Sequence, residues 1–92
     1  MSYYLKDPGA RVDYAIDWAP YLDGQSILAS EWQISPIEAG GIAMVEASFA
    51  GGRAAARLQG GIVGRTYRLG NLVTFSDGSV DERSITLRVE ER

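Results

Sequence analysis

The side chains of this sequence that could do chemistry are mainly carboxylates, because its 92 residues include no histidine and no cysteine. General acid–base and nucleophilic catalysis most often depend on those two residue types or on a carboxylate with a shifted pKa. No serine lies in a Gly-x-Ser-x-Gly turn, and the glycine-rich stretch 60–64 lacks the Lys-Ser/Thr pair of a phosphate-binding loop. We therefore expect no catalytic residues, no enzymatic activity and no cofactor.

Two groups of acidic residues raise the question of a calcium site. They are Asp13 and Asp17 in one segment, and Asp77, Asp81 and Glu82 around a later turn. Calcium takes several oxygen ligands, so the two groups could hold it if they converged. The Asp-x-Asp-x-Asp-Gly order of a calcium loop is missing, and zinc lacks its usual ligands. We interpret these carboxylates as solvated, expect no metal, and expect Arg83 to form an ion pair with its acidic neighbours.

The elements that must position these residues are short strands separated by turns. Glycine makes up 11 of the 92 residues and clusters between apolar stretches, as in chains of strands joined by turns. The predicted strands cover residues 11–18, 27–34, 42–49, 54–58, 66–76 and 82–90. Gly51-Gly52 and Asp77-Gly78 are hairpin signals. The pattern predicts an all-β fold, an immunoglobulin-like antiparallel β-sandwich of about six to seven strands.

Alternation within the strands predicts which side chains form the core. The inward rows are Val12, Tyr14, Ile16 and Trp18 in segment 11–18, Tyr67, Leu69, Val73 and Phe75 in segment 66–76, and Ile85, Leu87 and Val89 in segment 82–90. In the second strand, Leu28, Ser30 and Ile34 share a face with Trp32, which we expect to be the central aromatic residue of the core. The phase of the third strand is ambiguous, and a bulge near Glu46 would explain it.

The longest predicted strand raises two further questions. Asn71 falls in its apolar row, so either it is buried and hydrogen-bonded or a bulge turns Leu72 inward. Tyr67 follows a glycine corner, which suits a tyrosine corner in which the hydroxyl bonds to the backbone.

Charge and hydropathy exclude several classes of partner. The net charge is −3 and the isoelectric point about 4.8, so the basic surface that binds nucleic acid is missing. No apolar run approaches the roughly 20 residues that span a bilayer, and the first residues do not resemble a secretion signal. The lack of cysteine favours folding in a reducing cytoplasm.

The N-terminal residues predict a contact surface. We assign residues 1–10 to an arm and 11–92 to a single sandwich domain. Tyr3 and Tyr4 on such an arm would be exposed unless they docked on a partner. Trp18 and Tyr21 have two interpretations: they could stack on sugars, or Trp18 could belong to the core while Tyr21 covers one end of the sandwich.

Several sequence segments, taken in order and with their spacing, resemble the small fibre-tail adaptor proteins of tailed bacteriophages. They are Lys6-Asp7-Pro8, Asp13-Tyr14, Asp17-Trp18, Ser30-x-Trp32, Gly64-x-Thr66-Tyr67, Asn71 and the run Asp81-Glu82-Arg83-Ser84-Ile85-Thr86-Leu87-Arg88-Val89. The resemblance covers nearly the whole chain. It implies a virion structural protein with an immunoglobulin-like fold, made in the cytoplasm of the bacterial host and assembled into the tail region.

The expected function follows from this resemblance. The chain would join tail components or attach a fibre through contacts with other virion proteins, in multiple copies round a symmetric assembly, without binding nucleic acid or membrane. The expected contact residues are Tyr3, Tyr4, Leu5, Tyr21, Asp77, Asp81, Glu82 and Arg83. Deleting residues 1–8 should leave the fold intact and abolish incorporation. The alternative is a capsid decoration protein or a glycan-binding module on the virion.

Overall fold

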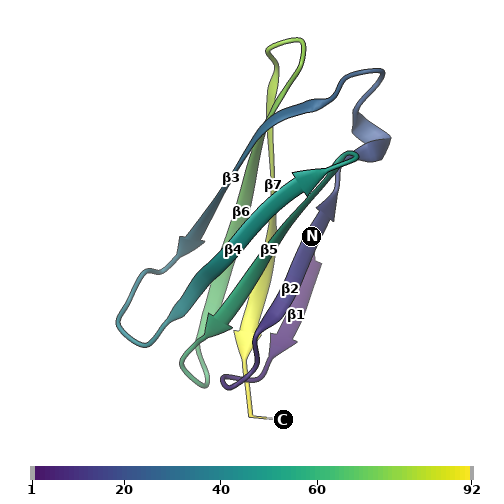
Figure 1. Ribbon diagram of the computed structural model, residues 1–92. Helices are drawn as coiled ribbons and strands as arrows, with labels where there is room; N and C mark the ends of the chain where they lie inside the picture. Colours follow the sequence, from purple (N-terminus) through teal and green to yellow (C-terminus); the bar gives the residue numbers. More distant parts are fainter. Residues whose placement is uncertain (1, 92) are drawn as a thin grey trace.

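The computed structural model describes residues 2–91, with side chains from Tyr4 onward, as seven strands in two sheets (Figure 1). The strands are β1 (Ser2–Lys6), β2 (Val12–Asp17), β3 (Ile27–Ser35), β4 (Ile42–Ala50), β5 (Arg53–Gly60), β6 (Thr66–Phe75) and β7 (Val80–Val89), and a 3-10 turn, η1 (Ala19–Tyr21), follows β2. One sheet has the order β1-β7-β6-β3 and the other β2-β5-β4. The all-β sandwich is therefore confirmed. No helix among these residues is long and apolar enough to cross a membrane.

The core lies between the two sheets and has two neighbouring clusters. One gathers around Leu58, Tyr67 and Leu87, and the other around Trp18 and Phe75. The inward alternation predicted for β2, β6 and β7 is confirmed, because the side chains that it places inward are buried or nearly so. The central aromatic residue was predicted wrongly. Trp18 is fully buried, whereas Trp32 is partly buried and packs against both clusters.

Glycines form the predicted hairpins. Gly51 and Gly52 both have positive φ, 59° and 81°, and connect β4 to β5 in the two-residue form that matches the twist of paired strands. Gly78, with φ 89°, turns the chain between β6 and β7. This second hairpin closes through hydrogen bonds between Phe75 and both Gly78 and Ser79. It carries Asp77, and Asp81 and Glu82 follow it at the start of β7.

Bulges change which side chains face the core in two edge strands. The register of β4 against β5 shifts between Met44 and Glu46, which confirms the predicted bulge. A second shift lies between Ile27 and Ala29 in β3 and was not predicted. It turns Leu28 outward, where it is 60% exposed, and Ile27 packs on the core in its place. The predicted inner position of Leu28 is therefore wrong, because one bulged residue reverses the alternation.

The predicted N-terminal arm is instead an edge strand. β1 pairs in parallel with β7 from Ser2↔Ile85 to Lys6↔Val89, so its backbone belongs to the sheet and the sandwich is not purely antiparallel. Lys6 is buried and its ammonium donates hydrogen bonds to the carbonyls of Asp7, Ala10 and Gly60 at 3.0, 2.7 and 2.7 Å. Burial lowers the pKa of Lys6, and the Asp7 carboxylate partly opposes this effect. These contacts fasten β1 and the following turn to β5.

Candidate interaction surfaces

One end of the sandwich is built around Trp18, where β2 turns into η1. The indole Nε1 of Trp18 donates a hydrogen bond to Asn71 Oδ1 at 2.8 Å, and the backbone N–H of Trp18 donates to the Gly52 carbonyl, also at 2.8 Å. Asp17 Oδ1 accepts a hydrogen bond from the backbone N–H of Ala19 at 3.0 Å and so steadies the start of η1. The turn then brings Tyr21 edge-on to Trp18, with ring centroids 6.1 Å apart.

Arg83 lies against these two rings. It pairs with Asn71 across β6 and β7 and alternates with Ile85, so its side chain starts from the inner side of the sheet. Its guanidinium carbon is 5.0 Å from the Tyr21 ring centroid and 5.9 Å from that of Trp18. A cation this close to an aromatic face is attracted by the ring quadrupole. The ion pair expected with Asp81 or Glu82 is absent among the described residues, because Arg83 stacks on the rings instead.

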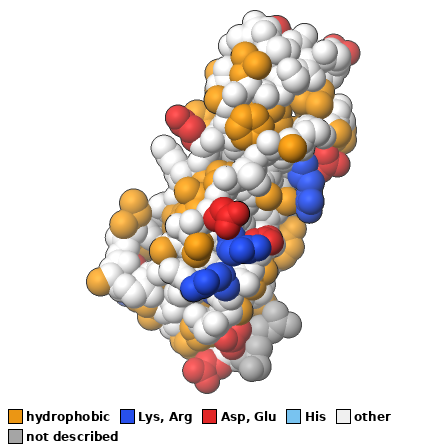
Figure 2. Space-filling view, viewed as in Figure 1, with side chains coloured by type: hydrophobic (Ala, Val, Ile, Leu, Met, Phe, Trp, Pro, Cys, Tyr) orange, Lys and Arg blue, Asp and Glu red, His pale blue; other side chains and the backbone are white. Residues whose placement is uncertain are grey.

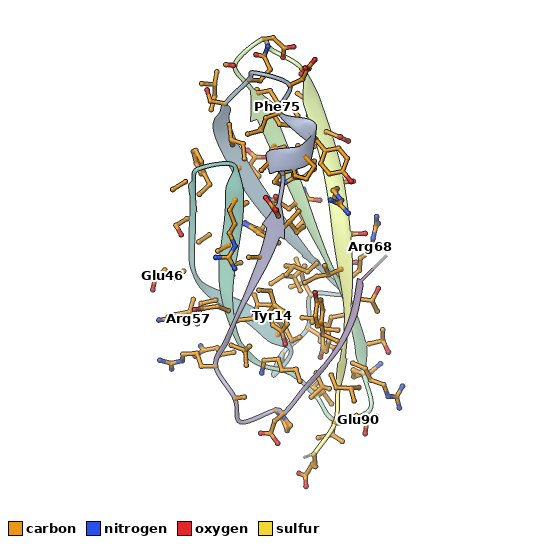
Figure 3. The ribbon with its side chains drawn as sticks, turned by 90° about the vertical axis from the view of Figure 1, so that its right-hand side faces the viewer. Tyr14, Glu46, Arg57, Arg68, Phe75 and Glu90 are labelled. Carbon is orange, nitrogen blue, oxygen red and sulfur yellow. The ribbon has the colours of Figure 1, made fainter. Side chains whose placement is uncertain are left out.

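A cleft of about 350 Å³ opens beside this cluster, between the η1 segment and the β6–β7 hairpin. Its lining consists of Tyr21, Leu22, Asp23, Gln25, Phe75, Asp77, Ser79, Val80 and Asp81. Figure 3 shows Phe75 next to η1 at this end of the molecule. Asp77 Oδ1 accepts hydrogen bonds from the Ser79 hydroxyl and backbone N–H at 2.5 and 2.9 Å. Mainly because of these bonds, the pKa of Asp77 lies below its usual value, so this carboxylate is charged at neutral pH.

The expected contact residues fall into separate groups. Tyr21, Asp77, Asp81 and Arg83 come together at the end just described. Glu82 starts from the outer side of the sheet, since it pairs with Leu72 and its carboxylate lies beside Gly70.

The remaining expected contacts lie on β1, near the other end of β7. Tyr4 is 42% exposed and its ring packs against Tyr14, with centroids 5.4 Å apart. Leu5, 47% exposed, follows Tyr4 and so points to the other face of the sheet. The side chain of Tyr3 lies outside the described part of the structure.

An exposed apolar surface on the edge strand β4 was missed. Apart from Ile42, the side chains of β4 are all exposed, and they include Met44, Val45 and Phe49. Figure 2 shows hydrophobic side chains on the face of the molecule that carries β4. The ambiguous alternation of this segment was the available signal, because a strand with one clear buried face alternates cleanly.

The comparisons with known proteins decide the family. The model of the family described as podophage GP4 fiber-tail adaptor protein gp77 matches residues 6–88. The chain belongs to this family. No curated protein matched the chain. Among solved structures, the adaptor-family chain is similar to the PKD domain from KIAA 1837 protein, with a TM-score of 0.63 and 16% identity, covering 100% of this chain and 83% of that one. This likeness concerns the immunoglobulin-like fold alone.

The carboxylates of this adaptor-family chain do not form the calcium site considered from the sequence. Asp13 accepts a hydrogen bond from Arg57 Nε at 2.8 Å on the outer face of the sheet, where Figure 3 shows Arg57 beside Glu46. That bond is the main reason why the pKa of Asp13 lies below its usual value. In the part of the chain that the structure describes, no group of three or more metal-ligating side chains comes together.

Of the two aromatic residues that could have stacked on a sugar, one is unavailable. Trp18 is 0% exposed and belongs to the core, so it offers no ring face to solvent. Tyr21 is 54% exposed, but Arg83 lies over its ring. The interpretation in which Trp18 is core and Tyr21 covers an end of the sandwich is the one that the geometry matches.

Proposed function

We propose that the chain is a non-enzymatic structural protein of a phage virion that joins tail components or attaches a fibre through protein–protein contacts. The observation that carries this proposal is the family match over residues 6–88. The fold supports it: a compact two-sheet sandwich with open edge strands offers backbone and side-chain contacts to neighbours. In this proposal the chain is made in the host cytoplasm, lies in the tail region, and binds neither nucleic acid nor membrane.

Two surfaces are proposed to make the contacts. The end surface consists of Tyr21, Asp77, Asp81 and Arg83. The β1 surface consists of Tyr4 and Leu5, with Tyr3 as a further contact. Aromatic residues and arginine are enriched among the residues that dominate the binding energy of interfaces. Several copies round a symmetric tail would make such modest contacts collectively strong.

Glu82 stays a proposed contact of a different kind, because it lies on the outer face of the sheet. It lines a shallow hollow of about 70 Å³ together with Gln33, Ser35, Arg68 and Gly70. A partner that reached Glu82 would therefore cover this outer face and not the end surface.

Locating the chain in purified particles tests the function. Mass spectrometry should find the chain in wild-type virions, and density maps should place it in the tail, between tail and fibre proteins. Density on the head would instead favour the decoration alternative. Absence from the particle would contradict the proposal.

The β1 surface can be tested with matched variants. Leu5→Ser should reduce incorporation into particles, because it removes an exposed apolar contact. Ile37→Ser is the control, since Ile37 is 91% exposed in the β3–β4 loop, outside both proposed surfaces. Equal incorporation of the two variants would contradict the role of Leu5.

A further inference from the structure

Arg83 is an exposed cation whose hydrogen-bonding groups are unused within residues 2–91. Its contacts there are the rings of Tyr21 and Trp18, and no carboxylate lies within 4.0 Å of its nitrogens. Asp81, two residues earlier on the same side of β7, also fails to pair with it. Stacking occupies the flat face of a guanidinium and leaves its in-plane N–H donors available. These donors are therefore open to a partner.

The support under Arg83 is fixed before any partner arrives. Trp18 is fully buried and held by its hydrogen bond to Asn71, and Asn71 in turn donates to Ser30 Oγ at 2.8 Å and to the Glu31 carbonyl at 3.1 Å. An arginine that is already held in place loses less conformational entropy when it binds. Binding of a partner to the fixed Arg83 therefore costs less entropy than binding to a freely moving surface arginine, which favours a strong contact.

The backbone next to Arg83 is open as well. β1 pairs with β7 only from Ile85 to Val89, so in the described chain no strand pairs with residues 80–84 on that side. The N–H and C=O groups along an unpaired strand edge can accept an added strand from another protein. Arg83 lies inside this open stretch.

We propose that an extended segment of a partner virion protein lies along the open edge of β7 and places one carboxylate against the guanidinium of Arg83. This inference rests on the proposed structural function and names the chemistry of the contact. The planar N–H fork of arginine matches a carboxylate through two parallel hydrogen bonds. Asp77, Asp81 and Asp23 line the adjacent cleft and repel strongly anionic groups. The matching segment therefore carries a single acidic residue among neutral or basic ones.

The test measures binding of the purified chain to purified phage particles that lack it. Wild-type chain should bind, and raising the salt concentration should weaken the binding, because screening reduces charge pairing. Arg83→Gln should bind about tenfold or more weakly and should lose much of the salt dependence. Arg83→Lys keeps the charge without the fork and should fall between them. Arg53→Gln is the matched control, since Arg53 is an exposed arginine on the other sheet, and it should bind as wild type does.

The outcomes separate this inference from the proposed function. If wild-type chain fails to bind the particles, the structural function itself is contradicted. If wild-type chain binds and Arg83→Gln binds equally well, the function stands and the Arg83 contact is overturned. A weakened Arg83→Gln that keeps the full salt dependence and has a lowered Tm also overturns it, since that pattern shows loss of folding and not loss of a charge pair.

Discussion

The buried side-chain amide of Asn71 links residues of both halves of the sandwich through hydrogen bonds. It is 0% exposed within an apolar row, and its side chain joins Trp18 on one side to Ser30 and Glu31 on β3 on the other. Of the two predictions for this position, burial with hydrogen bonds is therefore correct, and β6 needs no bulge there. The amide connects the end of β2 with both β6 and β3, which belong to the opposite sheet.

Replacing this amide should be costly even though the replacement is apolar. Asn71→Leu leaves the Trp18 indole N–H buried without an acceptor, and we expect a loss of about 1–3 kcal/mol in the free energy of unfolding. Gln33→Leu, which changes an exposed amide on β3, is the control and should change stability by about 0.5 kcal/mol at most. Urea denaturation of both variants measures the difference. Similar stabilities would contradict the role of the Asn71 network.

Tyr67 predicts a dependence on alkaline pH. Its hydroxyl accepts a hydrogen bond from the Ile62 N–H at 3.2 Å, which confirms the tyrosine corner, and donates one to Glu38 at 2.8 Å. Burial is the main cause that raises the pKa of Tyr67 above 10.0 in the folded chain. The stability from this group is therefore fully present below about pH 10 and is lost as the pH rises through the folded pKa.

The matched test compares two Tyr→Phe variants. Tyr67→Phe should lose about 1 kcal/mol at neutral pH, because two hydrogen bonds are removed. Its stability should also fall less than that of wild type when the pH is raised above about 10. Tyr21→Phe should keep the alkaline loss, since Tyr67 is intact. Thermal unfolding between neutral pH and pH 11 would show this, and parallel curves for wild type and Tyr67→Phe would contradict it.

At the scale of elements, β1 is held by a buried side chain as well as by its pairing with β7. Lys6 is the only lysine in the sequence, and all three hydrogen bonds of its ammonium go to backbone carbonyls. Lys6→Met should lower the free energy of unfolding by about 1–3 kcal/mol, because those carbonyls lose their charged donor. Arg11→Met, at an exposed position, is the control for removing a positive charge. Urea denaturation measures the free energy of unfolding of both variants. If Lys6→Met lowered it as little as Arg11→Met, the hydrogen bonds of Lys6 would not stabilise β1.

For the deletion of residues 1–8, the structure therefore leads us to expect a different result from the one predicted from the sequence. It removes β1 and Lys6 together, so we expect a destabilised sandwich and not an intact fold. Point variants on the outside of β1, such as Leu5→Ser, test the contact without removing the strand.

Local sequence signals predicted the elements that depend on local structure. The Gly51-Gly52 and Asp77-Gly78 signals predicted the hairpins, and alternation predicted the inner faces of β2, β6 and β7, because both depend on residues close together in the chain. The parallel pairing of β1 with β7 joins distant segments, and a five-residue strand carries too little alternation to show it. The stacking of Arg83 on Tyr21 could not be predicted either, because it depends on how η1 folds back over the sheet.

At the scale of the whole molecule, the proposed surfaces occupy different levels of an elongated body. The principal extents are 42 × 21 × 21 Å. The hairpin precedes β7, whereas Tyr4 and Leu5 pair with Leu87 and Arg88 near its end. One copy could therefore touch different neighbours at the two levels, which suits the role that we propose for it as a joint between virion proteins.

The two tryptophans offer a matched test of how the core is held together. Trp18 belongs to one core cluster and its N–H is bonded to Asn71, while Trp32 packs against both clusters and its buried Nε1 has no hydrogen-bond partner in the described structure. Trp18→Phe removes a satisfied hydrogen bond together with packing, whereas Trp32→Phe removes an unpaired donor together with similar packing. Trp18→Phe also leaves the buried Oδ1 of Asn71 without its donor, and an unpaired buried polar group costs about 1–3 kcal/mol.

The same substitution should therefore have unequal effects at the two positions. We expect Trp18→Phe to be more destabilising than Trp32→Phe by about 1 kcal/mol or more, as measured by urea denaturation. Trp32→Ala should cost more than Trp32→Phe, because it also empties the space between the two clusters. Equal losses in the free energy of unfolding for the two Trp→Phe variants would mean that the Trp18–Asn71 hydrogen bond adds no stability beyond that of packing. The predicted order instead makes that bond the contact that closes the end of the sandwich on which Arg83 rests.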